Sequence, residues 1–357
     1  MATRKRTQKP VISPNFFQEK EAMLRAITQA MQGKDFSGPE EAQAFLNQFT
    51  GKKMSEITSS LIGESDEFDA EEKADDLFFE AMEARSAAAC RRKLKEALRF
   101  NPNQVRAMMM LARSEKTPEA MERGLRNAIA TGERNLGDML PKGADHLWGF
   151  IEARPYLEAR AELAEFLAAE DRLDESIAEH QAVLALNEHD NQGLRDPLLS
   201  LLLQTRRFKD ARALVKKYDT DYSAVWLYAK AMLEFQRCAE LEKWDFALLD
   251  QAWLVQQLAA AAKGSLPEIP KAVRVADKTL IKALKFNPWC AIFLLKPAEH
   301  INEPLPEFYS PGNVEEARLF LHHHAPAWIE NPAALVWLML TAMPWLIKNG
   351  FSDEVGP

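Results

Sequence analysis

Two short polar segments hold the residues of this sequence best suited to binding chemistry. Each contains an arginine, and a guanidinium group can donate two parallel hydrogen bonds to one carboxylate. One segment adds a tryptophan and a tyrosine, which offer large and rigid contact surfaces, and the other adds two amide side chains. We predict that both segments form one patch that binds a partner's carboxylate, such as a peptide C-terminus or an acidic side chain. The predicted site consists of Trp148, Arg154, Tyr156, Asn191, Gln192 and Arg195.

The same residue types also fit a purely structural role. Trp148 and Phe150 could close the end of a hydrophobic layer, while Arg154 pairs with Glu152 or with the carboxyl end of a helix. Both interpretations stay open at the level of the sequence.

Histidines and cysteines give little support to a metal site. His322, His323 and His324 are adjacent, and neighbours on a helix point about 100° apart, so they cannot converge on one ion. His180 falls on an apolar stripe, which favours a packed helix residue. The three cysteines (Cys90, Cys238 and Cys290) are widely separated, which argues against disulfides and zinc ribbons and favours a reducing, cytoplasmic location. We therefore predict no metal and no cofactor.

The sequence also lacks recognised catalytic motifs. It has no GxxxxGK[ST] phosphate loop and no GxGxxG motif after a predicted strand, and no Ser-His-Asp arrangement can be recognised. We predict that the protein is not an enzyme.

The elements that must position these residues are helices. Tyr156, Ala159, Leu163 and Leu167 recur at helical spacing, as do apolar residues elsewhere, and no stretch alternates at period two. Glycine, at 14 of 357 residues, is too scarce for a fold built from many tight hairpins. The chain is predicted to be all-α.

A degenerate repeat orders the helices. The sequence KEALRFNP at 95–102 returns as IKALKFNP at 281–288, and AVLALNE at 182–188 is a weaker copy. The residue before proline is disfavoured in a helix, so each Asn-Pro predicts a helix boundary. This pattern resembles the tetratricopeptide repeat, a 34-residue pair of helices. That resemblance implies a solenoid of about five or six helix pairs with a concave binding face.

A narrower resemblance covers residues 145–338. In order, the matching segments are HLWGFIEARPY (146–156), DNQG (190–193), VKKYD (215–219), KALKFNP (282–288), LPEFYSPGNVEEA (305–317) and AWIENPAALVWL (327–338). They are similar to the suppressor of tumorigenicity protein 7 family and its bacterial soluble relatives. The resemblance implies a tetratricopeptide-like helical protein without an established enzymatic reaction. Trp289-Cys290 departs from the family, in which a histidine-valine pair is expected there.

These patterns divide the chain into predicted parts. We expect a basic disordered tail (1–14), an N-terminal helical segment (15–62), an acidic linker (63–70), a tetratricopeptide-like solenoid (71–300), a helical C-terminal cap (301–348) and a tail (349–357). Within the cap, a helix over 315–325 with Ser310 or Asn313 as its N-cap would close the solenoid together with Trp328 and Trp337.

The net charge of the chain and the length of its most apolar stretch limit the kinds of partner that we expect. Acidic residues outnumber basic ones by 53 to 45, so a net charge of −8 gives no overall attraction to nucleic acid. The most apolar stretch, 333–347, is shorter than the roughly 20 residues that span a bilayer, so we expect no membrane contact. The predicted function is a scaffold that binds a protein or peptide of unknown identity. The alternative is a regulatory RNA-associated protein with a local basic face formed by Arg91, Arg92, Lys93, Lys95, Arg99 and Arg106.

Circular dichroism tests the predicted fold class. The helical periodicity predicts a far-ultraviolet spectrum dominated by helix with essentially no sheet signal. A strand content of about 20%, the average for globular proteins, would contradict the all-α prediction.

Overall fold

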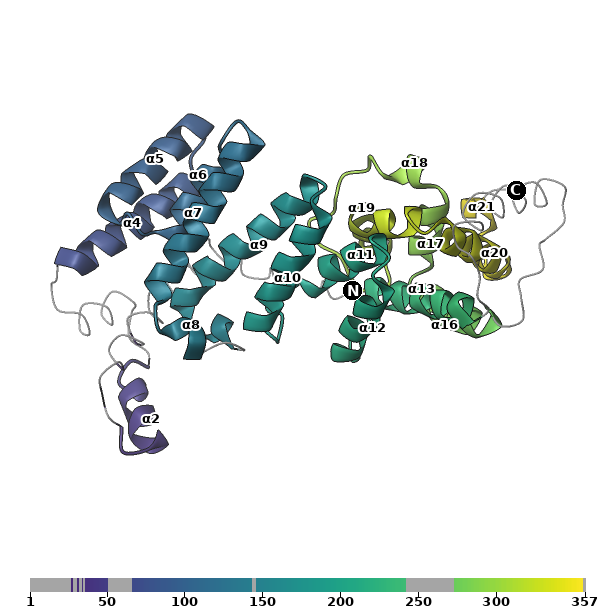
Figure 1. The fold of residues 1–357 in the computed structure, drawn as a ribbon, viewed down its shortest axis with the longest axis horizontal. Coiled ribbons are helices and arrows are strands. Elements are labelled where there is room, and N and C mark those ends of the chain that lie inside the picture. The colour runs from purple at the N-terminus through teal and green to yellow at the C-terminus, as the bar shows by residue number, and fades with distance from the viewer. Residues whose placement is uncertain are drawn as a thin grey trace, which may run out of the picture. The chain divides into compact units, whose positions relative to one another are not determined.

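A computed structural model of the protein describes residues 27, 31, 34, 36–50, 66–142, 146–241 and 273–355. Throughout these ranges the regular elements are helices, and the only β-type contact is an isolated bridge between His146 and Asn187 (Figure 1). The predicted all-α class is therefore confirmed for this part of the chain. The predicted basic tail at 1–14 lies outside the described residues, and the N-terminal segment 15–62 is described only in part, including helix α2 (Pro39–Asn47).

The described helices form two compact units. Unit 1 comprises Met1–Ala169 and Ala185–His189, and unit 2 comprises Glu170–Leu184 and Asp190–Pro357. Beyond α2, unit 1 contains α4 (Asp66–Met82), α5 (Ala87–Phe100), α6 (Val105–Arg113), α7 (Pro118–Leu136), α8 (Met139–Lys142), two 3-10 turns, η1 (Leu147–Gly149) and η2 (Ile151–Ala153), and α9 (Arg154–Ala169). Most of helix α10 (Leu173–Leu186) belongs to unit 2, up to Leu184. Unit 2 continues with α11 (Arg195–Gln204), α12 (Phe208–Lys217), α13 (Ala224–Leu241), α16 (Arg274–Phe286), α17 (Pro288–Leu295), α18 (Pro297–His300), α19 (Val314–Ile329), α20 (Pro332–Lys348) and α21 (Ser352–Val355).

Helix boundaries follow the capping residues of the sequence. Asn101 and Asn287 end α5 and α16, as the Asn-Pro pairs predict, and the Asn287 side chain also accepts a hydrogen bond from the Trp289 N–H at the start of α17. Asn313 caps α19 through the Glu316 N–H, which confirms one of the two predicted caps.

Helix α4 starts earlier than predicted, because Asp66 lies inside the segment 63–70 for which a linker was expected. Carboxylates near a helix N-terminus interact favourably with the helix dipole, so the acidic residues of this segment are compatible with helix. Ala74, Phe78 and Ala81 are buried and anchor α4 against α5.

Small residues let the helices of unit 1 approach closely. Leu125 and Ala128 of α7 join Leu163 and Leu167 of α9 in one apolar core. At the crossing of α6 and α7, a Cβ atom on Gly124 would lie only 2.6 Å from the Ala112 Cβ. Glycine at 124 therefore sets the distance between these two helices.

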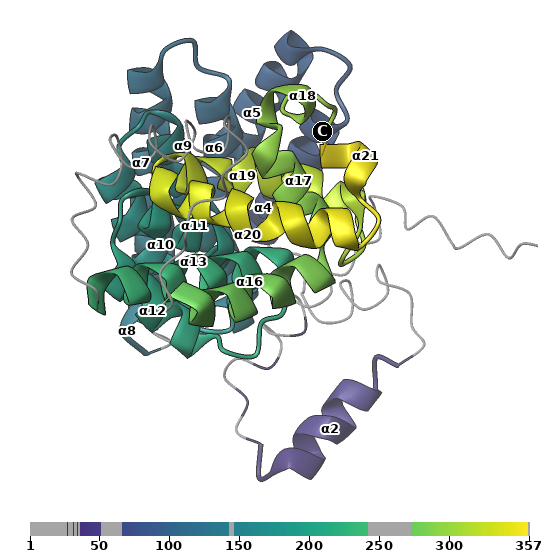
Figure 2. The same ribbon diagram turned by 90° about the vertical axis from the view of Figure 1, so that its right-hand side faces the viewer.

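The C-terminal helices are part of the core of unit 2. Helix α19 packs against α11, α13 and α17, and α20 packs against α16 (Figure 2). Trp328 and Trp337 are at most 2% exposed. Large apolar side chains from both sides of residue 300 therefore share one core, and the division into a solenoid (71–300) and a helical cap (301–348) stays a prediction.

A buried carboxylate joins four segments of unit 2. Glu316 of α19 is 7% exposed and accepts hydrogen bonds from the Asn287 side-chain amide (2.8 Å), from the Gly312 N–H (2.7 Å) and from the Ala224 N–H (3.3 Å). The Tyr228 hydroxyl donates to the Asn287 carbonyl at 2.7 Å. These bonds connect the start of α13, the α16–α17 junction, the turn before α19 and α19 itself.

Replacing this carboxylate tests its structural role. Glu316→Ala removes the acceptor that the Ala224 N–H, the Gly312 N–H and the Asn287 amide share, and the Asn287 amide keeps only its bond to the Asn313 carbonyl. We expect the free energy of unfolding to fall by about 2–5 kcal/mol in a denaturant titration. Glu315→Ala, on the neighbouring and more exposed residue, is the matched control and should cost less than about 1 kcal/mol. Equal losses in the two variants would contradict the role assigned to Glu316.

Candidate binding surfaces

In unit 1, the structure brings Arg154 and Trp148 together. The Arg154 Nε donates a hydrogen bond to the Trp148 carbonyl at 3.2 Å, and its guanidinium lies 5.3 Å from the centre of the Trp148 ring. Arg154 is the first residue of α9, and Trp148 lies in η1. The arginine therefore fixes the 3-10 turns that lead into α9.

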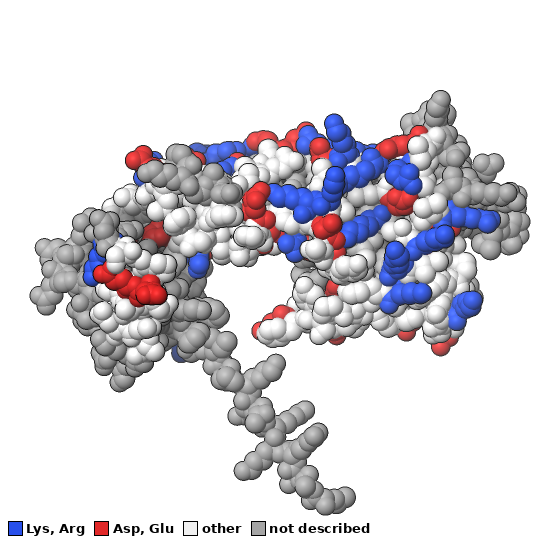
Figure 3. All heavy atoms as spheres, turned by 90° about the horizontal axis from the view of Figure 1, so that it is seen from below, with Lys and Arg blue, Asp and Glu red and all other residues white. Residues whose placement is uncertain are grey.

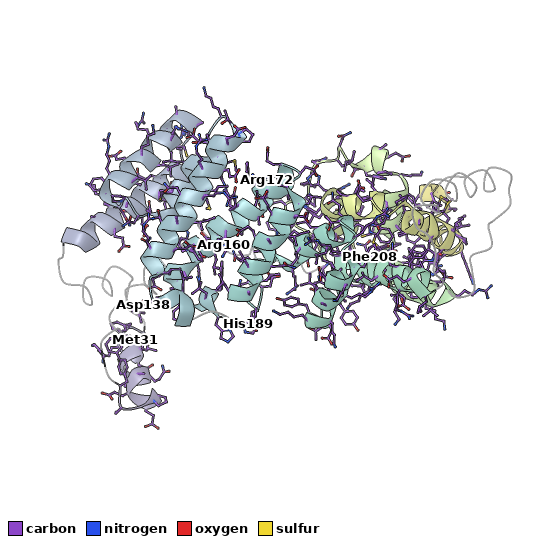
Figure 4. All side chains as sticks on the ribbon, viewed as in Figure 1. Met31, Asp138, Arg160, Arg172, His189 and Phe208 are labelled. Carbon is purple, nitrogen blue, oxygen red and sulfur yellow. The ribbon has the colours of Figure 1, made fainter. Side chains whose placement is uncertain are left out.

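Tyr156 has a packing role. Its ring is 3% exposed and lies against Gly132, where an added Cβ would come within 2.9 Å of the Tyr156 Cβ. The hydroxyl donates to Glu133 at 3.3 Å and accepts from Arg160 at 3.2 Å, and Figure 4 marks Arg160 on α9. A residue this buried offers almost no surface to a partner.

In unit 2, Arg195 is surrounded by carboxylates. Its Nη2 donates to Asp221 at 2.8 Å, and its Nε lies 3.8 Å from Asp190 and 4.0 Å from Asp196. The Asp190 side chain is fully buried and accepts hydrogen bonds from the N–H groups of Leu194 (2.7 Å) and Arg195 (3.1 Å). This bonding holds the turn that leads into α11.

Aromatic rings line the same cluster. The Arg195 guanidinium lies 5.3 Å from the centre of the Tyr218 ring and 6.0 Å from that of Trp226. Of the predicted amides, Asn191 is exposed and Gln192 is half-buried. With three carboxylates around one guanidinium, the surroundings of Arg195 are acidic and do not favour another anion.

The six predicted site residues therefore divide between the two units. Trp148, Arg154 and Tyr156 belong to unit 1, and Asn191, Gln192 and Arg195 belong to unit 2. A single patch that includes both sets stays a prediction.

Sequence reasoning missed a charged surface in unit 1. Helix α9 is largely buried, but Glu158, Glu162 and Glu165 keep contact with solvent at helical spacing. Arg106 of α6 donates two hydrogen bonds to Glu158, at 2.7 and 2.8 Å, and Arg113 of α6 makes a two-bond pair with Glu162. We call these five residues the α6/α9 face. Their helical spacing was a signal in the sequence, but only the packing of α6 on α9 assigns the partners.

Glu165 lies at the end of the α6/α9 face. Unlike Glu158 and Glu162, it forms no two-bond ion pair with an arginine of this face. Partial burial is the main cause that raises its pKa, and the nearby charge of Glu162 raises it further, while Arg113 lowers it. The face therefore carries two guanidinium groups and three carboxylates, a surplus of negative charge.

The adjacent histidines of α19 differ in their surroundings. His324 is buried, and burial lowers its pKa to about 3, while His322 and His323 are exposed. His180 is 1% exposed, as expected for a packed residue, and its Nδ1 lies 2.8 Å from the Ser176 carbonyl. Within the described ranges, no group of three or more His, Cys, Asp or Glu side chains is arranged to hold a metal ion.

Half of the basic cluster predicted around α5 forms ion pairs. Arg91 donates to Glu115 at 2.7 Å, Lys93 forms an ion pair with Glu80, and Arg106 belongs to the α6/α9 face. Half of the six predicted cations are thus engaged by carboxylates, which weakens the attraction of this region for phosphates.

Comparison with known protein families, with curated proteins and with solved structures finds no match for this chain. None of the helices in the described ranges is both long enough and apolar enough to cross a membrane.

Asp196 makes the cluster around Arg195 sensitive to pH. Its carboxylate accepts a 2.6 Å hydrogen bond from the Trp226 indole N–H. Burial raises the pKa of Asp196 to about 6, the Trp226 bond partly offsets this, and the charges of Asp221 and Asp190 add to the rise. Because 37% of the side chain remains exposed, solvent screening moderates the effect.

Asp196→Asn tests this linkage. A raised pKa in the folded state means that the stability contributed by protonated Asp196 is complete below about pH 4 and is lost as the pH rises through about 6. Asparagine does not titrate, so the variant does not lose this stability as the pH rises. Its side-chain oxygen can still accept the hydrogen bond from the Trp226 indole N–H. We therefore expect its stability relative to the wild type to increase between about pH 4 and pH 7 in denaturant titrations. A difference that does not change with pH would contradict the assignment.

Proposed function

We propose that the protein is a non-enzymatic scaffold that binds a protein or peptide segment on the α6/α9 face of unit 1. The observation that carries this proposal is the pair of two-bond ion pairs that hold Arg106 and Arg113 against Glu158 and Glu162. A tetratricopeptide-like arrangement of the helices and a cytoplasmic location remain part of the proposal. The resemblance to the suppressor of tumorigenicity protein 7 family supports it on the sequence segments given above.

Preorganisation makes this face suited to binding. Long charged side chains lose conformational entropy when a partner orders them. On the α6/α9 face the two arginines are already held by carboxylates on a largely buried helix. Binding a partner therefore costs less conformational entropy.

The surplus carboxylate indicates a basic ligand. A lysine or arginine side chain placed beside Glu165 would gain an ion pair, and the charge of Glu162 would contribute to the attraction. The acidic surroundings of Arg195 in unit 2 favour the same sign of ligand. We therefore propose a basic peptide segment, in place of the carboxylate expected from the two arginines alone.

A peptide array probed with the purified protein tests this proposal. Peptides that contain lysine and arginine should bind, and Glu165→Gln should raise the dissociation constant of the best peptide about tenfold, which corresponds to roughly 1.4 kcal/mol. Binding should also weaken as the pH falls through the raised pKa of Glu165, because only the ionised carboxylate attracts the cation.

Glu96→Gln is the matched control, since Glu96 is an exposed glutamate of unit 1 on α5 and lies outside the face. Equal weakening by both variants would contradict the proposed site. A preference for acidic peptides that is lost in Arg154→Ala and Arg195→Ala would instead favour the carboxylate-binding patch expected from the sequence.

A further inference from the structure

Helix α16 carries a row of exposed cations along one side. They follow one another at steps of four, four and three residues and are Arg274, Lys278, Lys282 and Lys285. The other side of the helix is buried in the core of unit 2, where it includes Leu280 and Leu284. Within the part of the chain that the structure describes, no ion pair or hydrogen bond engages these four cations, which we call the α16 stripe.

The helices beside α16 add positive charge to the same part of unit 2. Helix α13 packs against both α12 and α16. Of the exposed residues on these three helices, eight are lysine or arginine and only Asp210 and Glu240 are acidic. Glu240 already pairs with Arg212 at 2.7 Å, and the half-buried Asp277 accepts a hydrogen bond from the Trp337 indole N–H. The surface is therefore strongly cationic in a chain whose net charge is −8.

Figure 3 shows Lys and Arg side chains gathered over unit 2 in the view from below, the side on which α12 and α16 lie in Figure 1. A concentrated positive surface attracts polyanions even when the whole chain is acidic, because charges more than a Debye length away are screened.

The uncharged residues of this surface indicate which polyanion it suits. On α12, α13 and α16 the exposed uncharged residues are Ala213, Leu241 and Val275, with no Ser, Thr, Asn, Gln or aromatic residue among them. Single strands are held by stacking bases on aromatic rings. RNA is distinguished through its 2′-hydroxyl groups, and neutral polar side chains, which can donate and accept, are missing from this surface. A duplex contacted only through its phosphates needs neither kind of residue.

The α16 stripe also matches the charge density of a DNA duplex. The stripe spans 11 residue steps, about 16 Å at 1.5 Å per residue. Duplex DNA carries one negative charge per about 1.7 Å of its axis, which gives roughly nine charges over that length. Each of the four cations therefore has phosphates within its reach. Because α16 packs between α13 and α20, it presents only one side to a duplex and contacts the backbone without entering a groove.

We propose that the α16 stripe binds the phosphate backbone of double-stranded DNA, whatever the base sequence. This contact lies in unit 2 and is independent of the peptide site proposed for unit 1. An anionic membrane fits the stripe less well, because a helix that lies in a membrane interface inserts a broad apolar side, and Val275 is the only exposed apolar residue of α16. Binding without base contacts is weak and strongly dependent on salt.

Fluorescence anisotropy of a labelled DNA duplex of about 20 base pairs, titrated with the full chain, tests the proposal. The logarithm of the association constant should fall linearly with the logarithm of the salt concentration, with a slope of about −3.6 for four phosphate contacts at 0.9 each. Two duplexes of unrelated sequence should have dissociation constants within about twofold of each other, because phosphate contacts carry no sequence information.

The double variant Lys278→Ala with Lys282→Ala removes two of the four contacts. It should reduce the magnitude of the salt slope by about two and raise the dissociation constant more than about tenfold at roughly 0.05 M salt. The matched control is Lys95→Ala with Arg99→Ala, two exposed cations of α5 whose loss changes the net charge equally. Helix α5 packs against α4, which has eight acidic residues among its 17, so we expect the control to bind DNA within about twofold of the wild type.

Circular dichroism should show that both double variants keep the helical fold. A wild-type chain that does not bind the duplex at roughly 0.05 M salt would overturn the proposal. So would an equal loss in the α5 control, or a salt slope that the α16 variant leaves unchanged. An RNA duplex of the same sequence that binds more than about tenfold tighter, or phosphatidylserine vesicles that bind the chain when the DNA duplex does not, would assign the stripe to another partner and also overturn it.

Discussion

Burying the Glu316 carboxylate is the constraint on which unit 2 depends. A buried charge is costly unless its oxygens accept hydrogen bonds, and here the donors come from three other segments of the chain. The start of α13, the α16–α17 junction and the turn before α19 must all reach this one side chain. Around them, Trp328 and Trp337 are buried, and the ring of Phe235 stacks on Trp337 at 4.8 Å. Polar bonds fix the arrangement of the segments, and apolar burial supplies most of the driving force.

Unit 1 uses charge differently. Its core depends on small residues, such as Ala112 opposite Gly124, which allow α6 and α7 to approach closely. Its ion pairs lie at the surface between α6 and α9, where they contribute little to stability but restrict long side chains to one geometry. Such restriction is useful for recognition, because a surface that is already ordered loses less entropy when it binds.

Two arginines have roles in the fold that differ from those expected from the sequence. Arg195 attracts attention in the sequence as a free donor beside two amides, but in the fold it neutralises part of an acidic cluster and lies beside two aromatic rings. Arg154 holds the turn that contains Trp148. Other exposed cations lie on α16, and two of them, Lys282 and Lys285, belong to the repeated segment 281–288.

The sequence by itself determined the helical class and several helix ends, because helical periodicity and Asn-Pro boundaries are local properties. Asn287 and Asn313 cap helices as their spacing predicts. Only the tertiary structure decided which charged side chains pair, that Tyr156 is buried, and that α19 and α20 belong to the core of unit 2. These features depend on contacts between residues far apart in the chain, such as Asn287 with Glu316 or Asp277 with Trp337. A carboxylate or guanidinium has many possible partners in a sequence, and the packing of the helices leaves it only those within reach.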